Sequence, residues 1–170
     1  MTQEIHLRPV AEPDLAMFRR FAVEPGLIGL DWTGFRDAQE PARQFAANGY
    51  LSPDGGRLMV AVGDDTAGYV SWRRGAYMPE SWYWEIGIAL LPEWRGKGIG
   101  WRAQAMLCEY LFHHTPVQRI QACTHPENLA EQRALEKAGF QLEGVVRAAE
   151  FRAGQWRDGL LYSRLRSDPS

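Results

Sequence analysis

The stretch EWRGKGIGWRAQAML, Glu93–Leu107, places three glycines and two basic residues within six positions and then continues as a good helix former. It follows the apolar run EIGIALLP at 85–92, which has the composition of a strand. Gly96, Gly98 and Gly100 remove side chains that would hold a ligand away from the backbone. The first N–H groups of a helix lack partners within the helix, and the macrodipole adds about half a positive charge there. A strand, a glycine-rich loop and a helix in direct succession therefore predict an anion cradle.

Two basic side chains in this loop, Arg95 and Lys97, would add attraction for phosphate groups. A P-loop requires a lysine followed by Ser or Thr, whereas Lys97 stands between two glycines and no Ser or Thr follows. A dinucleotide-binding fold requires G-x-G-x-x-G and an acidic residue at the end of the next strand. Here the spacing is G-x-G-x-G, and the next strand ends in Cys123–His125. The predicted ligand carries phosphates but fits neither of these two classes of site.

Bulk composition favours one compact domain over residues 1–170, with 45% apolar and 24% charged residues. The net charge of -2 argues against a protein that coats nucleic acid. No apolar run is long enough for a membrane span, and MTQEIHLRP does not resemble a secretory signal, so we expect a cytoplasmic location. Cys108 and Cys123 are expected to be buried thiols rather than a disulfide. The spacing of the histidines and cysteines predicts no metal site.

Hydrophobic periodicity gives the order of the elements. It predicts seven strands, at 5–9, 57–63, 67–74, 81–91, 119–125, 141–151 and 155–165. It predicts four helices, at 12–21, 37–47, 98–113 and 127–139. Within the strand at 81–91, the alternation places Glu85 and Tyr83 on one face and Trp84 on the other. The glycine-rich connection at 24–34 is a plausible mobile loop. This order predicts a mixed α/β (α+β) sheet.

Three motifs in this order resemble those of the GNAT superfamily of acyl-CoA N-acyltransferases. RGKGIG at 95–100 matches the signature [QR]-x-x-G-x-[GA], and HPENLAEQRALEKAGF at 125–140 is similar to the family's asparagine-bearing helix with its Gly-Phe end. FRAGQWRDGLLYSRL at 151–165 resembles the last hairpin of the RimJ/RimL-type branch. The resemblance implies the GNAT fold: a mixed, mostly antiparallel seven-stranded sheet with about four helices, whose fourth and fifth strands splay around the acyl-CoA.

The resemblance also implies acetyl-CoA as cosubstrate, without a metal. The pantetheine arm would pair with the main chain near Ile88 and Leu90 like an added strand. The backbone N–H of Ile88 or Ala89 would stabilise the developing oxyanion. The expected cofactor contacts are Ile88, Ala89, Leu90, Arg95, Gly96, Lys97, Gly98, Ile99, Gly100 and Asn128.

Glu85 and Asn128 are the candidate catalytic residues. Glu85 is an acid embedded in an aromatic strand, and we expect it to be the general base. Two other interpretations stay open, namely a structural acid that pairs with Arg73 or Arg74, and a position on an exposed face. Asn128 precedes a helix, where its amide can cap the helix, contact the pantetheine region, or do both.

Aromatic residues are the candidates for binding the acceptor. Trp32, Tyr83 and Trp84 lie in segments expected near the acceptor cleft, although most tryptophans pack in a core. The general acid is unassigned, because Glu131 and Leu135 stand where relatives often have Ser or Tyr. A protonated Glu131 or water would supply the proton, or the thiolate would leave unaided.

The sequence therefore predicts an enzyme that moves an acetyl group from acetyl-CoA to a primary amine by direct transfer in a ternary complex. The acceptor would be a protein or peptide N-terminal amine or a small-molecule amine, and the protein a monomer or homodimer with no nucleic acid or membrane partner. The alternative is a non-catalytic CoA-binding sensor or interaction module on the same fold.

Overall fold

The computed structural model of the chain describes residues 4–169. Its helices and 3-10 turns are η1 (Glu12–Asp14), α1 (Leu15–Val23), η2 (Gly29–Asp31), α2 (Glu40–Asn48), η3 (Pro92–Trp94), α3 (Ile99–His114) and α4 (Leu129–Lys137). Its strands are β1 (Ile5–Pro9), β2 (Leu51–Ser52), β3 (Gly55–Val62), β4 (Asp65–Met78), β5 (Ser81–Leu90), β6 (Arg119–Thr124), β7 (Gln141–Arg152) and β8 (Gln155–Leu165). All seven predicted strands and four predicted helices are present.

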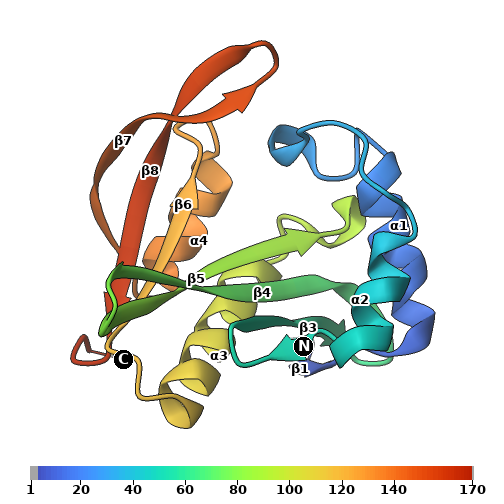
Figure 1. Cartoon of the computed structure of the whole chain (residues 1–170), viewed down its shortest axis with the longest axis horizontal. Helices are drawn as coiled ribbons and strands as arrows, with labels where there is room; N and C mark the ends of the chain where they lie inside the picture. The colour runs from blue at the N-terminus through green and yellow to red at the C-terminus, as the bar shows by residue number, and fades with distance from the viewer. Residues whose placement is uncertain (1–3, 170) are drawn as a thin grey trace.

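One sheet runs through the molecule in the order β1-β3-β4-β5-β6-β8-β7, with the two-residue β2 added beside β3 (Figure 1). Its pairs are antiparallel, except that β5 and β6 run parallel. The predicted mixed and mostly antiparallel α/β sheet is confirmed. β2 was not predicted, and two residues are too few to show a strand periodicity.

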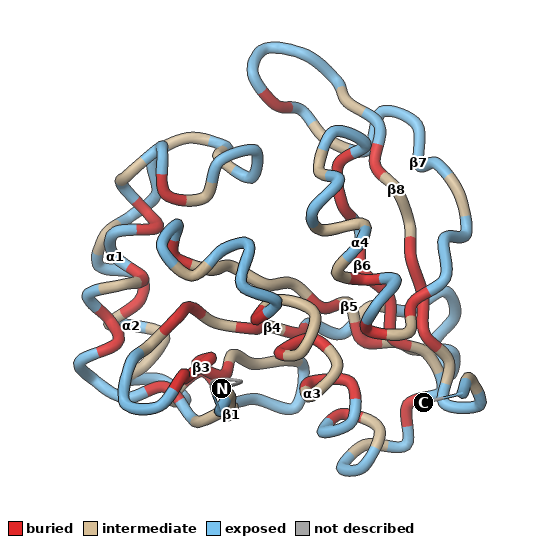
Figure 2. The backbone as a smooth tube through the Cα atoms, turned by 180° about the vertical axis from the view of Figure 1, so that it is seen from behind, coloured by how far each residue is buried: buried red, intermediate tan, exposed pale blue. Residues whose placement is uncertain are grey.

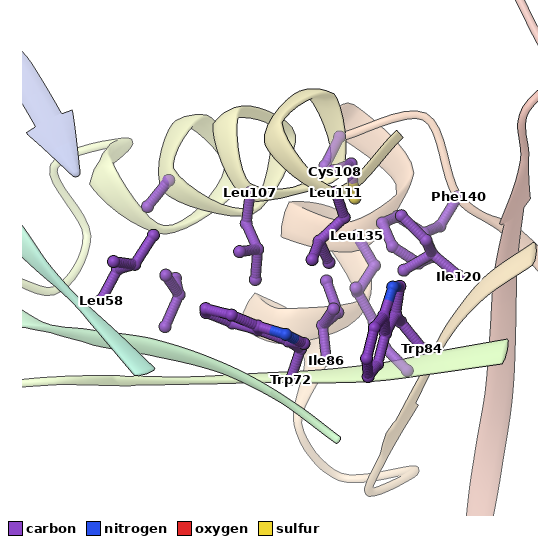
Figure 3. Close-up of a cluster of buried hydrophobic side chains, with 14 of the residues drawn as sticks. Leu58, Trp72, Trp84, Ile86, Leu107, Cys108, Leu111, Ile120, Leu135 and Phe140 are labelled. Carbon is purple, nitrogen blue, oxygen red and sulfur yellow. The ribbon is translucent and has the colours of Figure 1, made fainter. Parts of the chain in front are cut away.

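Helices cover both faces of the sheet. On one face, α3 and α4 pack over the main core, where Trp84 and Ile86 of β5 meet Leu107 and Leu135 (Figure 3). On the other face, Phe18 of α1 packs with the buried Met59 of β3. Figure 2 shows the buried positions gathered in the central strands, whereas β7 is exposed along most of its length.

The two parallel strands separate soon after they meet. β5 pairs with β6 only at Trp84↔Ile120 and Glu85↔Gln121, although β5 continues to Leu90. Figure 1 shows the strands diverging from there, β5 toward α1 and β6 toward the tip of the β7–β8 hairpin. At residues 86–90, the edge of β5 that faces β6 therefore has no neighbouring strand among the described residues, whereas the other edge pairs with β4. The resemblance implied this separation for the fourth and fifth strands.

Local chemistry explains where the boundaries differ from the predictions. The carboxylate of Asp37 accepts a hydrogen bond from the backbone N–H of Gln39 at 2.8 Å, and α2 begins only at Glu40. Such an Asx turn competes with helical hydrogen bonds. The expectation of two buried thiols holds for Cys108 and is wrong for Cys123. Cys123 is exposed because the core side chain of its neighbour Ala122 points to the opposite face of β6.

Candidate active site

The predicted cradle lies where β5 ends and α3 begins. Gly96 and Gly98 have φ angles of 72° and 73°, and Gly98 is the N-cap of the 16-residue α3. This left-handed conformation is costly for residues with a Cβ, which explains glycine at both positions. A Cβ at Gly96 would meet nothing within 4 Å, so the loop backbone is open to a ligand.

A cavity of about 620 Å³, here called the cradle cavity, joins this loop to the free edge of β5. Eight of the predicted cofactor contacts line it: Ile88, Ala89, Leu90, Arg95, Gly96, Gly98, Gly100 and Asn128. Arg133 and Lys137 of α4 add positive charge to its wall. An exposed strand edge next to a positively charged helix N-terminus fits a long thioester arm that ends in a diphosphate.

Three side chains of the loop make contacts that the sequence did not predict. The Arg95 guanidinium donates hydrogen bonds to the backbone carbonyls of Leu90, at 2.9 Å, and Leu27, and it thereby ties the connection between α1 and α2 to the loop. Lys97 is outside the cavity lining, and its Nζ lies 5.1 Å from the centre of the Trp94 ring. The Ile99 side chain is 1% exposed and belongs to the core, because it begins the buried stripe of α3.

Glu85 lies in a second cavity of about 660 Å³, here called the Glu85 cavity, on the other face of the sheet from Trp84. Arg73 is its direct partner across β4 and β5, and Arg73 Nη2 lies 2.5 Å from Glu85 Oε1. The Arg73 side chain is largely exposed, and the Glu85 side chain is largely covered. The structure thus brings Glu85 to a cavity and also shows the ion pair that the sequence left open.

The predicted acceptor residues do not line the Glu85 cavity. Trp84 is a wrong prediction, because it is 3% exposed in the core and donates a hydrogen bond from Nε1 to Thr115 Oγ1 at 3.0 Å. Trp32 packs edge-on against Phe35, with 5.3 Å between ring centres. Tyr83 packs against Tyr77, with 4.9 Å between ring centres.

Other aromatic residues line the Glu85 cavity, and sequence reasoning missed them. They are Phe18, Phe21, Tyr50, Tyr69 and Trp72. The Arg57 guanidinium lies 4.9–5.2 Å from three of their ring centres, in cation–π contact with Phe18, Tyr50 and Tyr69. These rings come from α1, from the residue before β2 and from β4, so no local sequence pattern joins them.

The two cavities meet at Asp31, which lines both of them together with Ile28. Asp31 Oδ1 lies 2.9 Å from Nε2 of His125, a residue that is 3% exposed. Glu150 Oε2 is 3.1 Å from the other ring nitrogen, although in an orientation that makes no hydrogen bond. Sequence analysis did not select Asp31, which is one acid in a loop and gains its position only through His125, 94 residues away.

The first turn of α4 contributes Asn128 and Glu131 to the cradle cavity. Asn128 is the N-cap of α4, and its Oδ1 accepts a hydrogen bond from the backbone N–H of Glu131 at 3.2 Å. Both interpretations of Asn128 are therefore compatible with its place, since it caps the helix and lines the cavity. Burial raises the pKa of the Glu131 carboxyl to about 7, and the charge of Asp31 acts in the same direction.

A family model described as an acetyltransferase (GNAT) domain matches residues 4–141. The chain therefore belongs to the GNAT acetyltransferase family. Over 83 residues it is 39% identical to the probable N-acetyltransferase YjcK of Bacillus subtilis (strain 168), a match that covers 49% of this chain and 46% of that protein. The chain thus spans about half the length of the curated relatives that it matches.

Two solved structures resemble the whole described fold. The spermidine N-acetyltransferase of Vibrio cholerae, in complex with CoA and spermine, has a TM-score of 0.84 at 19% identity, over 96% of both chains. RimL, a ribosomal L7/L12 alpha-N-protein acetyltransferase in complex with coenzyme A, has a TM-score of 0.79 at 20% identity, over 97% of this chain and 95% of that one. The predicted GNAT fold is confirmed, and RimL is among the solved proteins that share it.

Two further predictions concern absent features. Within residues 4–169, no helix has the length and apolar character required to cross a membrane. In the same part of the chain, no three His, Cys, Asp or Glu side chains gather into a group that could hold a metal ion.

Proposed function

We propose that the protein is an N-acetyltransferase that moves the acetyl group of acetyl-CoA to a primary amine by direct transfer within a ternary complex. The observation that carries this proposal is the meeting of two cavities around β5. One runs from the glycine cradle along the strand edge at 86–90, and the other contains Glu85. Both share Asp31 and Ile28, so ligands in the two cavities would meet there.

The cradle cavity suits acetyl-CoA by its chemistry. The N–H groups at the start of α3 and the cations Arg133 and Lys137 would hold the diphosphate. The main chain at 88–90 would pair with the pantetheine arm. A backbone N–H of Ile88 or Ala89 would then face the thioester carbonyl and stabilise the negative charge that develops on its oxygen.

Glu85 would act as the general base that takes the proton of the attacking amine, directly or through water. Its carboxylate is held in one orientation by Arg73, and this cross-strand pair fixes the base at the wall of the acceptor cavity. General base catalysis requires a carboxylate within reach of the amine, which a position at the cavity wall provides.

The acceptor cavity carries more acidic than basic side chains. Its lining contains Asp31, Asp37, Glu40, Asp54 and Glu85 against Arg36, Arg57 and Arg73. Arg43 pairs with Asp37 and Glu40, and Arg74 lies 3.9 Å from Asp54. The attraction for an ammonium group, the form in which primary amines arrive from solution, would therefore come chiefly from Asp31 and Glu85. The acceptor is thus a small-molecule amine, such as the polyamine of the spermidine N-acetyltransferase, or a protein N-terminal amine, as for RimL.

The test is a thiol-release assay with acetyl-CoA across polyamines, amino sugars and peptides, paired with thermal-shift measurements. Saturation at about 100 times the dissociation constant should stabilise the folded protein by about 2.7 kcal/mol. Glu85→Gln should bind CoA normally and lose turnover by about 100-fold or more. Arg73→Gln breaks the same ion pair but keeps the base, so its loss should be much smaller.

Each alternative has its own outcome in these assays. A thermal shift with CoA but no turnover on any amine would support the sensor. Equal losses in Glu85→Gln and Arg73→Gln would show that the ion pair, rather than the base, is what matters. No shift with CoA or its thioesters would reject the proposal.

A further inference from the structure

Glu131 is a carboxyl group that the proposed function leaves without a task. It lies in the first turn of α4 and lines the cradle cavity together with Ala89. A glutamate at this helix position often forms a capping box by accepting a hydrogen bond from the N-cap N–H. Here the N-cap residue Asn128 donates its N–H to the carbonyl of His125 at 3.0 Å, so the Glu131 carboxyl is not used for capping.

The surroundings of Glu131 favour its protonated form. Gln104 of α3 packs beside it and is only 1% exposed. Gln104 Nε2 is buried and makes no hydrogen bond of normal geometry with residues 4–169; as a donor beside the carboxyl it favours the charged form, an effect that burial outweighs. Burial raises the pKa of Glu131 to about 7, with a further contribution from Asp31 and an opposing one from Gln104. The carboxyl is therefore protonated in a large fraction of molecules near neutral pH.

The position of Glu131 is near the proposed binding sites of both acetyl-CoA and the amine. Asp31, whose charge acts on Glu131, lines both cavities and marks their junction. Glu131 thus lies in the cradle cavity near the end where the thioester would meet the amine. The charged side chains that line the same cavity are Asp31, Arg95, Arg133 and Lys137.

We propose that Glu131 is the general acid of the transfer reaction and that it delivers a proton to the CoA sulfur as the thioester bond breaks. The proposal rests on the acetyltransferase function proposed above. It assigns a catalytic role to a residue of α4 that lines the cradle cavity together with Ile88, Ala89 and Leu90 of β5, the strand that carries Glu85.

Atoms and charges balance in this step. The ammonium group first releases one proton to solvent, and the neutral amine nitrogen then bonds to the acetyl carbon and loses a second proton to Glu85. The carbon–sulfur bond breaks with its electron pair going to sulfur, and Glu131 gives its proton to that sulfur. The products are the amide and the CoA thiol. Glu85 has gained one proton and Glu131 has lost one, so the total charge of the two carboxyl groups is unchanged. Exchange with solvent restores both carboxyl groups.

The experiment compares Glu131→Gln with Glu136→Gln, the same change at an exposed position of the same helix outside the cavity. Glu131→Gln should lower kcat by about 100-fold, since general acid catalysis contributes factors of this order. It should leave the Kd for CoA within about threefold of wild type. Glu136→Gln should behave as wild type in both measurements.

The pH profile separates a proton donor from a structural residue. In the wild type, kcat should fall as the pH rises above about 7, because Glu131 loses its proton. Glu131→Gln should lose this limb. Calorimetry of CoA binding at pH 7 in two buffers of different ionisation enthalpy gives a readout without turnover. The wild type should take up a fraction of a proton as CoA covers Glu131, and Glu131→Gln should take up none.

The two proposals fail in different ways. If the wild type transfers acetyl groups and Glu131→Gln retains more than half of kcat with an unchanged pH limb, the acid assignment is overturned and the enzyme proposal stands. If the wild type binds CoA without turnover on any amine, both are overturned. Equal proton uptake by wild type and Glu131→Gln would also contradict the assignment.

Discussion

Replacing Glu131 by the isosteric glutamine should stabilise the protein in a way that depends on pH. The folded-state pKa of about 7 is above the ordinary value of 4.5. A factor of ten in proton affinity is worth about 1.36 kcal/mol, so ionised Glu131 costs the folded state at most about 3 kcal/mol. Because the folded-state pKa is raised, the wild type is favoured at low pH and loses this stability as the pH rises from about 4.5 through about 7. Glutamine has no charge to bury and escapes the loss.

The assay is urea unfolding of wild type and Glu131→Gln at pH 5 and pH 8.5, with Glu136→Gln as control. The advantage of Glu131→Gln should grow by about 2.5 kcal/mol between these pH values. In thermal melts this corresponds to about 5–10 °C for a chain of this size. A constant difference at both pH values would refute the reasoning, since it would mean that burial does not disfavour the charged carboxylate. Growth of similar size in Glu136→Gln would assign the effect to the helix rather than to the site.

Three further predictions test the cradle, an ion pair and the core. Gly98→Ala should cost about 1 kcal/mol of stability because of its φ of 73°, and it should also weaken CoA binding. Gly100→Ala, whose Cβ would make ordinary contacts, should weaken CoA binding without destabilising the fold. Thermal melts and calorimetry measure both effects, and equal melting temperatures for the two variants would contradict the strain assigned to Gly98. Hydrogen bonds from Arg119 and Ser163 lower the pKa of Glu143 to about 2. Glu143→Gln should therefore cost about 1 kcal/mol of stability at pH 7 after solvent screening, and urea titrations should show this cost disappearing as the pH falls from 4.5 to about 2. A cost that persists at pH 2 would be inconsistent with the Arg119–Glu143 ion pair. Burial raises the pKa of the fully buried Cys108 to about 12, so a thiol reagent at pH 8 should modify only Cys123 in the folded protein and both cysteines after unfolding, as counted by intact mass.

Local chemistry made the cradle and most of the elements predictable. The glycines at 96 and 98 indicate a left-handed turn, and the helix that follows has its apolar residues on one face. Both signals come from neighbouring residues, so the sequence alone is enough to predict the cradle. The alternation of β5 was also readable, because Glu85 and Trp84 must point to opposite faces. Alternation does not say which face a helix will cover. The Trp84 prediction failed for this reason, since α3 and α4 cover its face.

Contacts between distant segments could not be predicted in this way. Arg95 was expected to attract phosphate because of its charge, but its guanidinium reaches the carbonyl of Leu27, 68 residues away. Phe18 and Tyr50 come into contact only because α1 packs on β3 and β4, on the face of the sheet opposite α3 and α4. Such placements depend on tertiary packing, which a single sequence without an alignment does not encode locally.

The connection between α1 and α2 contributes both residues that line the two cavities in common, Ile28 and Asp31. Arg95 donates a hydrogen bond to the carbonyl of Leu27, and His125, just after β6, pairs with Asp31. The two shared residues are therefore held close to both contacts, since Asp31 makes one of them and Ile28 follows Leu27. A ligand that shifts Arg95 would therefore move the wall of the acceptor cavity and change the field on Glu131 together. For the proposed acetyltransferase, we therefore expect acetyl-CoA and the amine to be bound at the same time, because the residues that line both cavities belong to one segment that contacts the cradle loop.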